Sequence, residues 1–235
     1  NKLFFDLDLL SLHSRERELA QMSLTAELLD RFIEIYNFTD TLELARKNLK
    51  DIEPDAFENC RHRKIRTLRL QCLKIVDKKE QQIVFEREHS SLFEPLKEHL
   101  EELNLAYQGF RCKFNFLRDL KHLKKLSIGS CDFYDGCYPV FKCANNQLTY
   151  LNIGSSKMVI SDKTMFNDLK CLKHLDLSYL TLDSDLMPDL FSEIKQLETL
   201  KLDGSKLTLT EDAFIHLENL NELHLVEIEI PKECS

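Results

Sequence analysis

Histidine and cysteine are the residues of this sequence with the most obvious catalytic or metal-binding chemistry, and there are eight of each. Their spacing builds no recognisable centre, because the sequence contains no Cys-x-x-Cys pair, no His-Glu-x-x-His helix and no Gly-x-Ser-x-Gly turn. A glycine-rich loop that would cradle a phosphate is also missing from it. We therefore expect no catalytic residue, no resident metal and no cofactor, and we predict that the protein is not an enzyme.

Charge and hydrophobicity indicate an ordinary folded domain. Hydrophobic residues make up 43% and charged residues 31%, and the net charge is −8. The acidic balance argues against nucleic acid as a partner, because phosphates are neutralised by clustered cations. No apolar stretch of about 18 residues occurs, so we expect no membrane contact by this segment. The first residues lack Met and do not resemble a signal peptide, so we expect a chain processed or cut from a longer one.

The elements that position these side chains come from a repeat. The pattern is an aliphatic residue, two variable residues, Leu, one variable residue, and then Leu or Ile. The middle leucines, which we call the marker leucines, are Leu42, Leu68, Leu103, Leu126, Leu151, Leu175, Leu200 and Leu223. Six of the steps between them are 23 to 26 residues and one is 35. This regularity predicts a repeat architecture, and a further copy is expected at residues 4–12.

Burial explains why the copies must stack. Alternation at Leu-x-Leu places two side chains on one face of a short strand. A second apolar cluster, such as Phe166 with Leu169, follows each strand and packs behind it. The burial of one copy stabilises it by roughly 9–18 kcal/mol, which does not exceed the conformational entropy of ordering about 24 residues. Stacked copies then form a parallel sheet on the inner arc of a curved solenoid.

The pattern resembles the leucine-rich-repeat family over about residues 39–230. The outer halves IEPDAFENC at 52–60 and LTEDAFIHLENL at 209–220 are similar to the typical class of repeat in extracellular receptors. The resemblance implies an α/β leucine-rich-repeat solenoid, a right-handed superhelix with a curved parallel sheet on its concave face. It also implies that the concave face recognises another macromolecule.

The turn after each strand departs from the family pattern. Three residues after the last strand aliphatic, the family has Asn or Cys, whose side chain hydrogen-bonds the backbone between turns. Only Cys131 fits here, because the other positions are Lys47, Leu73, Gln108, Ser156, Leu180, Ser205 and Ile228. We therefore expect irregular turns in place of a regular ladder.

Two regions interrupt the repeats. Residues 14–36 have apolar side chains at helical steps and predict a helix with Ser14 as its N-cap, which either packs on the stack or binds a partner. Residues 76–99 read as an inserted, solvated loop, with proximity to a binding site as the alternative. We expect residues 1–38 to be an N-terminal strand/helix cap or irregular first repeat. Residues 39–235 are then the leucine-rich-repeat domain, with an insertion near 76–99.

The prediction of the cellular compartment rests on an expected glycan and on the cysteines. Asn37 begins the single Asn-x-Ser/Thr sequon and is the expected glycosylation site. Cys112, Cys137 and Cys143 fall in the outer halves of adjacent repeats, and Cys112 with Cys137 is the first candidate disulfide. Cys60 takes the place of a buried leucine. We expect a secreted or extracellular protein, and the alternative is a cytoplasmic one with reduced thiols.

Side chains between the strand aliphatics project from the concave face and predict the binding surface. We expect partner contacts from Arg69, Tyr107, Lys125, Tyr150, Asn152, His174, Asp176, Tyr179, Lys201 and His224. Tyrosine is enriched at binding hot spots, and mixed charge signs suit a protein ligand. The predicted function is protein–protein recognition by a secreted protein or receptor ectodomain fragment, in innate immunity or adhesion by resemblance. The alternative is an intracellular scaffold or adaptor that uses the same face.

Overall fold

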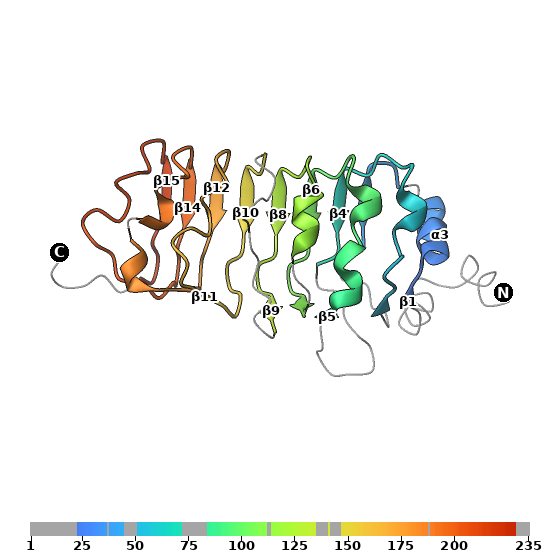
Figure 1. Cartoon of the computed structure of the whole chain (residues 1–235), viewed down its shortest axis with the longest axis horizontal. Helices are drawn as coiled ribbons and strands as arrows, with labels where there is room; N and C mark the ends of the chain where they lie inside the picture. Colours follow the sequence, from blue (N-terminus) through green and yellow to red (C-terminus); the bar gives the residue numbers. More distant parts are fainter. Residues whose placement is uncertain are drawn as a thin grey trace.

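One long parallel sheet dominates the computed structural model (Figure 1). The structure describes residues 23–36, 38–44, 51–71, 84–111, 114–134, 141, 147–187 and 189–228, so the further copy expected at 4–12 lies outside it. From the N-terminal end, the neighbouring strands are β2 (Thr41–Glu43), β4 (Thr67–Arg69), β6 (Glu102–Asn104), β8 (Lys125–Ser127), β10 (Tyr150–Asn152), β12 (His174–Asp176), β14 (Thr199–Lys201) and β15 (Glu222–His224). Each strand comes from one predicted copy, which confirms the repeat.

The register of the sheet confirms the marker leucines. Leu151 lies opposite Leu126 on one side and opposite Leu175 on the other. The other marker leucines pair with their neighbours in the same way from Leu42 to Leu223. All except Leu223 are almost completely buried, and those from Leu68 to Leu200 are covered by a repeat on each side.

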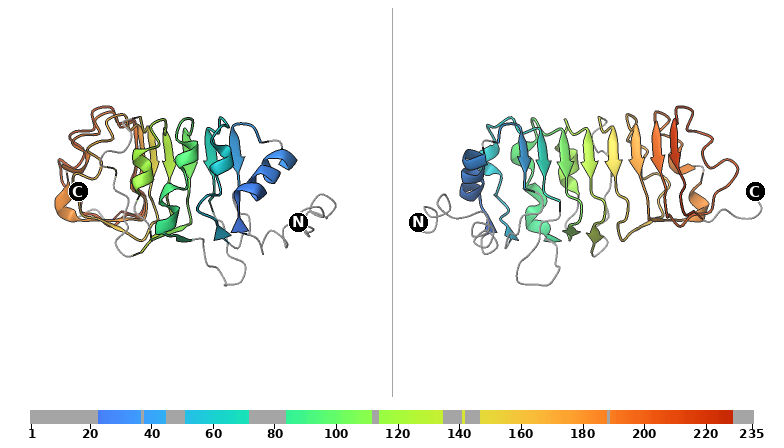
Figure 2. Two further views of the ribbon diagram at one scale, coloured as in Figure 1. Left: turned by 45° about the vertical axis from the view of Figure 1, so that its right-hand side comes forward. Right: turned by 180° about the vertical axis from the view of Figure 1, so that it is seen from behind.

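Short elements form the outer layer behind the sheet. The outer strands are β1 (Ser23–Leu24), β3 (Asp51–Ile52), β5 (Val84–Phe85), β7 (Gly109–Phe110), β9 (Asp132–Phe133), β11 (Val159–Ile160) and β13 (Thr181–Leu182). The 3-10 helices are η1 (Glu58–Cys60), η2 (Arg87–Ser91), η3 (Glu94–Leu96), η4 (Asn115–Arg118), η5 (Ser184–Leu186) and η6 (Asp189–Phe191). Stacked rings of Phe85, Phe110 and Phe133, with centroids 5.2 and 5.7 Å apart, join consecutive repeats. Figure 2 shows the row of strands from two further sides, with the outer layer along its length.

The N-terminal helix is shorter than predicted. Residues 23–24 form β1, which pairs in parallel with β3, and the helix α3 (Ala26–Tyr36) begins two residues later. Its cap is Thr25, whose hydroxyl oxygen accepts a hydrogen bond from the Leu28 N–H at 3.2 Å, whereas Ser14 lies outside the described residues. Strand pairing takes the backbone of β1 out of the helix. Leu29 and Ile33 are buried on one face of α3, as the helical spacing predicts.

Residues 84–99, which we expected to be solvated loop, are packed into the outer layer instead. β5 pairs with β7, and Phe85 and Phe93 are buried. The buried ring of His89 places its Nε2 atom 2.8 Å from the carbonyl oxygen of Ile52, one repeat earlier in the outer layer. The expectation was wrong because the charged residues of this segment face outward while its apolar residues face the core.

The six turns that the structure describes after β6, β8, β10, β12, β14 and β15 are regular, which corrects the expectation of irregular turns there. One residue per turn, four after the marker leucine, has a left-handed backbone with φ between 55° and 63°. These residues, which we call the turn row, are Tyr107, Ser130, Ser155, Tyr179, Gly204 and Glu227. The repeated conformation means that successive turns stack in register.

A side-chain ladder also joins the turns. Gln108, Cys131, Ser156 and Ser205 donate hydrogen bonds to the carbonyls of Leu70, Leu105, Ile128 and Leu177, one repeat earlier, at 3.0, 3.3, 3.1 and 2.8 Å. The Ser156 hydroxyl oxygen also accepts from the Cys131 N–H at 3.2 Å. The prediction failed because it counted only Asn and Cys, whereas any buried amide, thiol or hydroxyl donor at this depth can satisfy the carbonyl.

Candidate partner-binding face

The strands present two rows of side chains on the concave face, one on each side of the marker leucines. Before the marker, the row runs Thr41, Thr67, Glu102, Lys125, Tyr150, His174, Thr199 and Glu222. After the marker, it runs Glu43, Arg69, Asn104, Ser127, Asn152, Asp176, Lys201 and His224. Strand alternation turns these side chains away from the core, and the parallel register sets neighbours about 4.8 Å apart.

An open groove lies over the middle of this face, with a volume of about 650 Å³. Its walls come from β4 to β12 and from the residues just before two of these strands. They are Arg69, Glu102, Leu103, Asn104, Lys125, Leu126, Ser127, Thr149, Tyr150, Lys173 and His174. The groove therefore brings together Arg69, Lys125, Tyr150 and His174 of the predicted contact residues.

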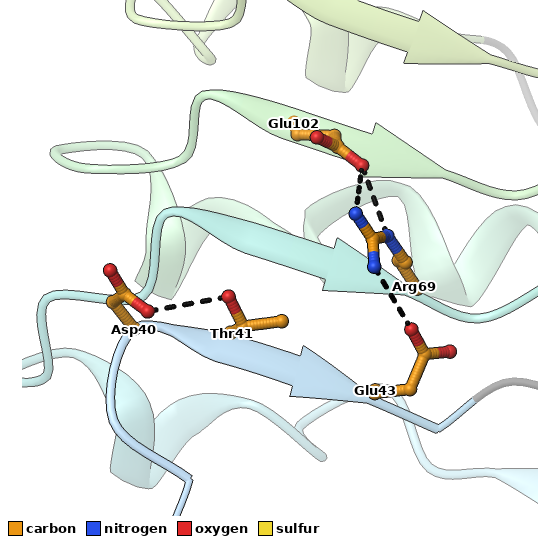
Figure 3. Close-up of polar contacts among 5 residues, drawn as sticks. All are labelled: Asp40, Thr41, Glu43, Arg69 and Glu102. Carbon is orange, nitrogen blue, oxygen red and sulfur yellow. Dashed lines mark hydrogen bonds and ion pairs between the residues drawn. The ribbon is translucent and has the colours of Figure 1, made fainter.

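The cation at the N-terminal end of the groove is held by two carboxylates. The Arg69 guanidinium donates to Glu102 at 2.9 and 3.0 Å and to Glu43 at 3.3 Å (Figure 3). The hydrogen bond with Glu102 is the largest cause of a raised Arg69 pKa. Alignment of the repeats in the sequence already places Glu43, Arg69 and Glu102 on neighbouring strands, so this ion-pair network could have been predicted. Because its donors already have acceptors, Arg69 is less free to bind a partner than we expected.

Two lysines beside the groove are likewise paired between neighbouring repeats. The Lys124 ammonium lies 2.8 Å from a Glu101 carboxylate oxygen, and Lys173 lies 2.6 Å from Glu198. These hydrogen bonds lower the pKa of Glu101 and of Glu198. Both pairs are largely exposed, so each contributes little to stability. Their effect is to fix the charge pattern along the edge of the concave face.

Three side chains in the centre of the groove are left for other contacts. Lys125, Tyr150 and His174 are opposite one another on β8, β10 and β12, and the rings of Tyr150 and His174 have centroids 6.4 Å apart. Lys125 is exposed, and the described part of the chain gives it no ion-pair partner. A cation, a phenol and an imidazole in one row can bind acceptors and apolar groups of a ligand.

Asn152 and Asp176 have a structural role as well as a place on the concave face. The Oδ1 atom of Asn152 accepts from the Gly154 N–H at 2.9 Å, and that of Asp176 accepts from the Ser178 N–H at 3.0 Å. These bonds hold the turns that follow the strands, so the two side chains are partly committed to the fold. The remaining strand predictions, Lys201 and His224, lie beyond the groove on β14 and β15.

Tyr107 and Tyr179 are in the turn row and not on the strands, which corrects their predicted position. Their φ angles are 62° and 58°, because the chain leaves the strand direction before it reaches them. Their side chains are 54% and 59% exposed, so both remain accessible to a partner at the edge of the sheet. The repeat pattern gives no sign of Gly204, whose role beside Tyr179 appears only in the fold.

The cysteines and the sequon have mixed outcomes. Asn37, Cys112 and Cys137 lie outside the described residues, so the glycan and the disulfide stay predictions. Cys60 is a buried free thiol as predicted, and burial raises its pKa to about 11. Burial likewise raises the pKa of Cys131 to about 12. Both thiols are therefore protonated and unreactive at neutral pH.

Two kinds of site are absent from the part of the chain that the structure describes. It holds no group of three or more His, Cys, Asp or Glu side chains placed to bind a metal ion. None of its helices has the length and apolar character that a bilayer span requires.

The structure resembles solved leucine-rich-repeat structures. A chain of the Toll–Spatzle complex of Drosophila has a TM-score of 0.62 and 17% identity, covering 90% of this chain and 27% of that one. The TLR13–ssRNA13 complex has a TM-score of 0.57 and 20% identity, with 91% and 33% covered. The ectodomain of the plant membrane receptor kinase GASSHO1/SCHENGEN3 from Arabidopsis thaliana, in complex with CASPARIAN STRIP INTEGRITY FACTOR 2, has a TM-score of 0.54 and 17% identity, with 89% and 26% covered.

These likenesses establish the fold, which is a leucine-rich-repeat solenoid. The chain spans about a third or less of the length of these proteins. No model of a protein family matches the sequence, and no curated protein matches it.

Proposed function

We propose that this chain is a recognition module that binds a protein partner on its concave face, without catalysis. The observation that carries the proposal is the groove over β4 to β12, where Lys125, Tyr150 and His174 are presented in one row and their side chains form no hydrogen bond or ion pair with the described residues. Structural neighbours include complexes with Spatzle and with CASPARIAN STRIP INTEGRITY FACTOR 2, which supports recognition as the role of this kind of sheet.

The proposal extends to the location and organisation of the chain. We propose a secreted protein or receptor ectodomain fragment, with a glycan on Asn37 and a Cys112–Cys137 disulfide. Residues 1–38 would serve as the N-terminal cap of the repeat domain at 39–235. The alternative is an intracellular scaffold with reduced thiols. Glycosidase digestion and counting of free thiols by mass spectrometry distinguish the two, because the extracellular protein carries a glycan and fewer than eight free thiols.

The test of the concave face is affinity capture with quantitative mass spectrometry. The immobilised chain is compared with the double variant Lys125→Ala/Tyr150→Ala and with Lys170→Ala, an exposed lysine of the outer half, as the matched control. We expect the double variant to capture at least ten-fold less of a protein that the control variant still captures. Equal capture by the double variant refutes the assigned surface. Nuclease treatment of the eluate shows whether RNA is captured in place of protein, and such capture refutes the proposed class of partner. This control is needed because one structural neighbour is the TLR13–ssRNA13 complex.

A further inference from the structure

The turn row contains two exposed tyrosines, Tyr107 and Tyr179, and Tyr179 is the one that a glycine follows in the row. Tyr179 has a left-handed backbone with φ of 58°, and its side chain is 59% exposed. A bulky residue is disfavoured in that conformation, and three of the other turns use serine or glycine. The described residues give the Tyr179 hydroxyl no hydrogen-bond partner, so the fold does not account for the ring.

Gly204 leaves room for this ring. A Cβ atom added to Gly204 would come within 2.3 Å of Cε1 and 2.4 Å of Cδ1 of Tyr179. The ring therefore rests directly on the glycine backbone of the next turn, and any side chain there would displace it. The Cδ1–Cε1 side of the ring lies against Gly204, while Tyr179 is 59% exposed, so much of the ring meets solvent.

Two acidic residues flank Gly204 in this aromatic platform, which consists of Tyr179 and Gly204. Asp203 precedes Gly204, and one of its carboxylate oxygens accepts from the Val226 N–H at 2.8 Å. Glu227 occupies the next position of the turn row and is exposed. Within the described ranges, no lysine or arginine forms an ion pair with either carboxylate, and the Nδ1 atom of the His224 ring lies 4.0 Å from an Asp203 carboxylate oxygen. The platform thus combines an exposed aromatic ring with two carboxylates that form no ion pair with a lysine or arginine of the described residues.

This combination fits a planar cation. A guanidinium over an aromatic face is attracted by the negative potential of the ring, and neighbouring carboxylates accept its N–H donors. The chain contains such a contact elsewhere, where the Arg111 guanidinium lies 5.0 Å from the centroid of the Tyr134 ring. We propose that Tyr179, lying on Gly204 beside Asp203 and Glu227, binds an arginine side chain of the protein partner. The inference rests on the proposed function, to which it adds a second contact outside the groove.

A titration with a small probe tests the platform without the partner. The chain, with its tyrosine rings labelled with ¹³C, is titrated with N-acetyl-arginine amide and, separately, with the neutral isostere N-acetyl-citrulline amide. The Tyr179 signal is identified by its loss in Tyr179→Leu. Tyr107 is the matched internal control, because it is also exposed and left-handed but Ser130 and Ser155 follow it in the turn row.

We expect the arginine probe to shift the Tyr179 signal in the millimolar range, with citrulline and Tyr107 giving at least five-fold smaller shifts. Glu227→Gln should reduce the shift of the Tyr179 signal at least three-fold, with a spectrum that otherwise remains that of the folded chain. An unmoved Tyr179 signal, or equal shifts with citrulline or at Tyr107, overturns the inference. Because this readout does not involve Lys125 or Tyr150, loss of the platform and loss of partner capture through the groove are separate results.

Discussion

Removing one ladder hydroxyl isolates the contribution of the turns to stability. The buried Ser156 side chain donates to the Ile128 carbonyl at 3.1 Å and accepts from the Cys131 N–H at 3.2 Å. Ser156→Ala leaves both buried backbone groups without these partners. Each unsatisfied group costs about 1–1.5 kcal/mol, so we expect a loss of about 2–3 kcal/mol in the free energy of unfolding.

Urea denaturation followed by far-ultraviolet circular dichroism measures this loss, since the chain has no tryptophan. The matched control is Ser127→Ala, a half-exposed serine of the concave face, for which we expect a change within about 0.5 kcal/mol. Ser156→Cys should recover part of the stability, because Cys131 performs the same role one repeat earlier. If Ser156→Ala and Ser127→Ala have equal stabilities, the ladder does not stabilise the stack and the reasoning fails.

Three further predictions concern packing, backbone and pH. Leu151→Ala should cost about 3 kcal/mol, and Leu223→Ala, at the same repeat position but 40% exposed, should cost less than half of that in the same urea titration; equal losses would contradict the stacking argument. Gly204→Ala should cost about 1–2 kcal/mol and shift the ring signal of the tyrosine that rests on it, whereas Ser155→Ala, also left-handed, should do neither. Burial raises the pKa of the Cys60 thiol from 9.0 to about 11, so the unfolded state loses the proton first and stability falls as pH rises from about 9 to 11. Cys60→Ala should lose that part of the pH dependence, and identical slopes would show that the thiol makes no such contribution.

Periodicity alone determined most of the fold. A marker leucine at a near-constant step fixes which side chains enter the core and which lie on the concave face, because strand alternation and stacking are local rules. Lys125, Tyr150 and His174 could therefore be assigned to one surface before any coordinates, and their position in one row is confirmed.

Spacing did not decide which polar groups remain available. Arg69 is engaged by Glu43 and Glu102, and the hydroxyl of Ser156 reaches a carbonyl 28 residues away. Tyr179 stands in a turn because the chain leaves the strand direction first. Each of these facts depends on atoms of neighbouring repeats meeting within about 3 Å, and the hydrophobic pattern carries no information at that distance. The sequence by itself determined the stacking of the repeats, whereas only the tertiary structure decided which polar groups pair between them and which are left for a partner.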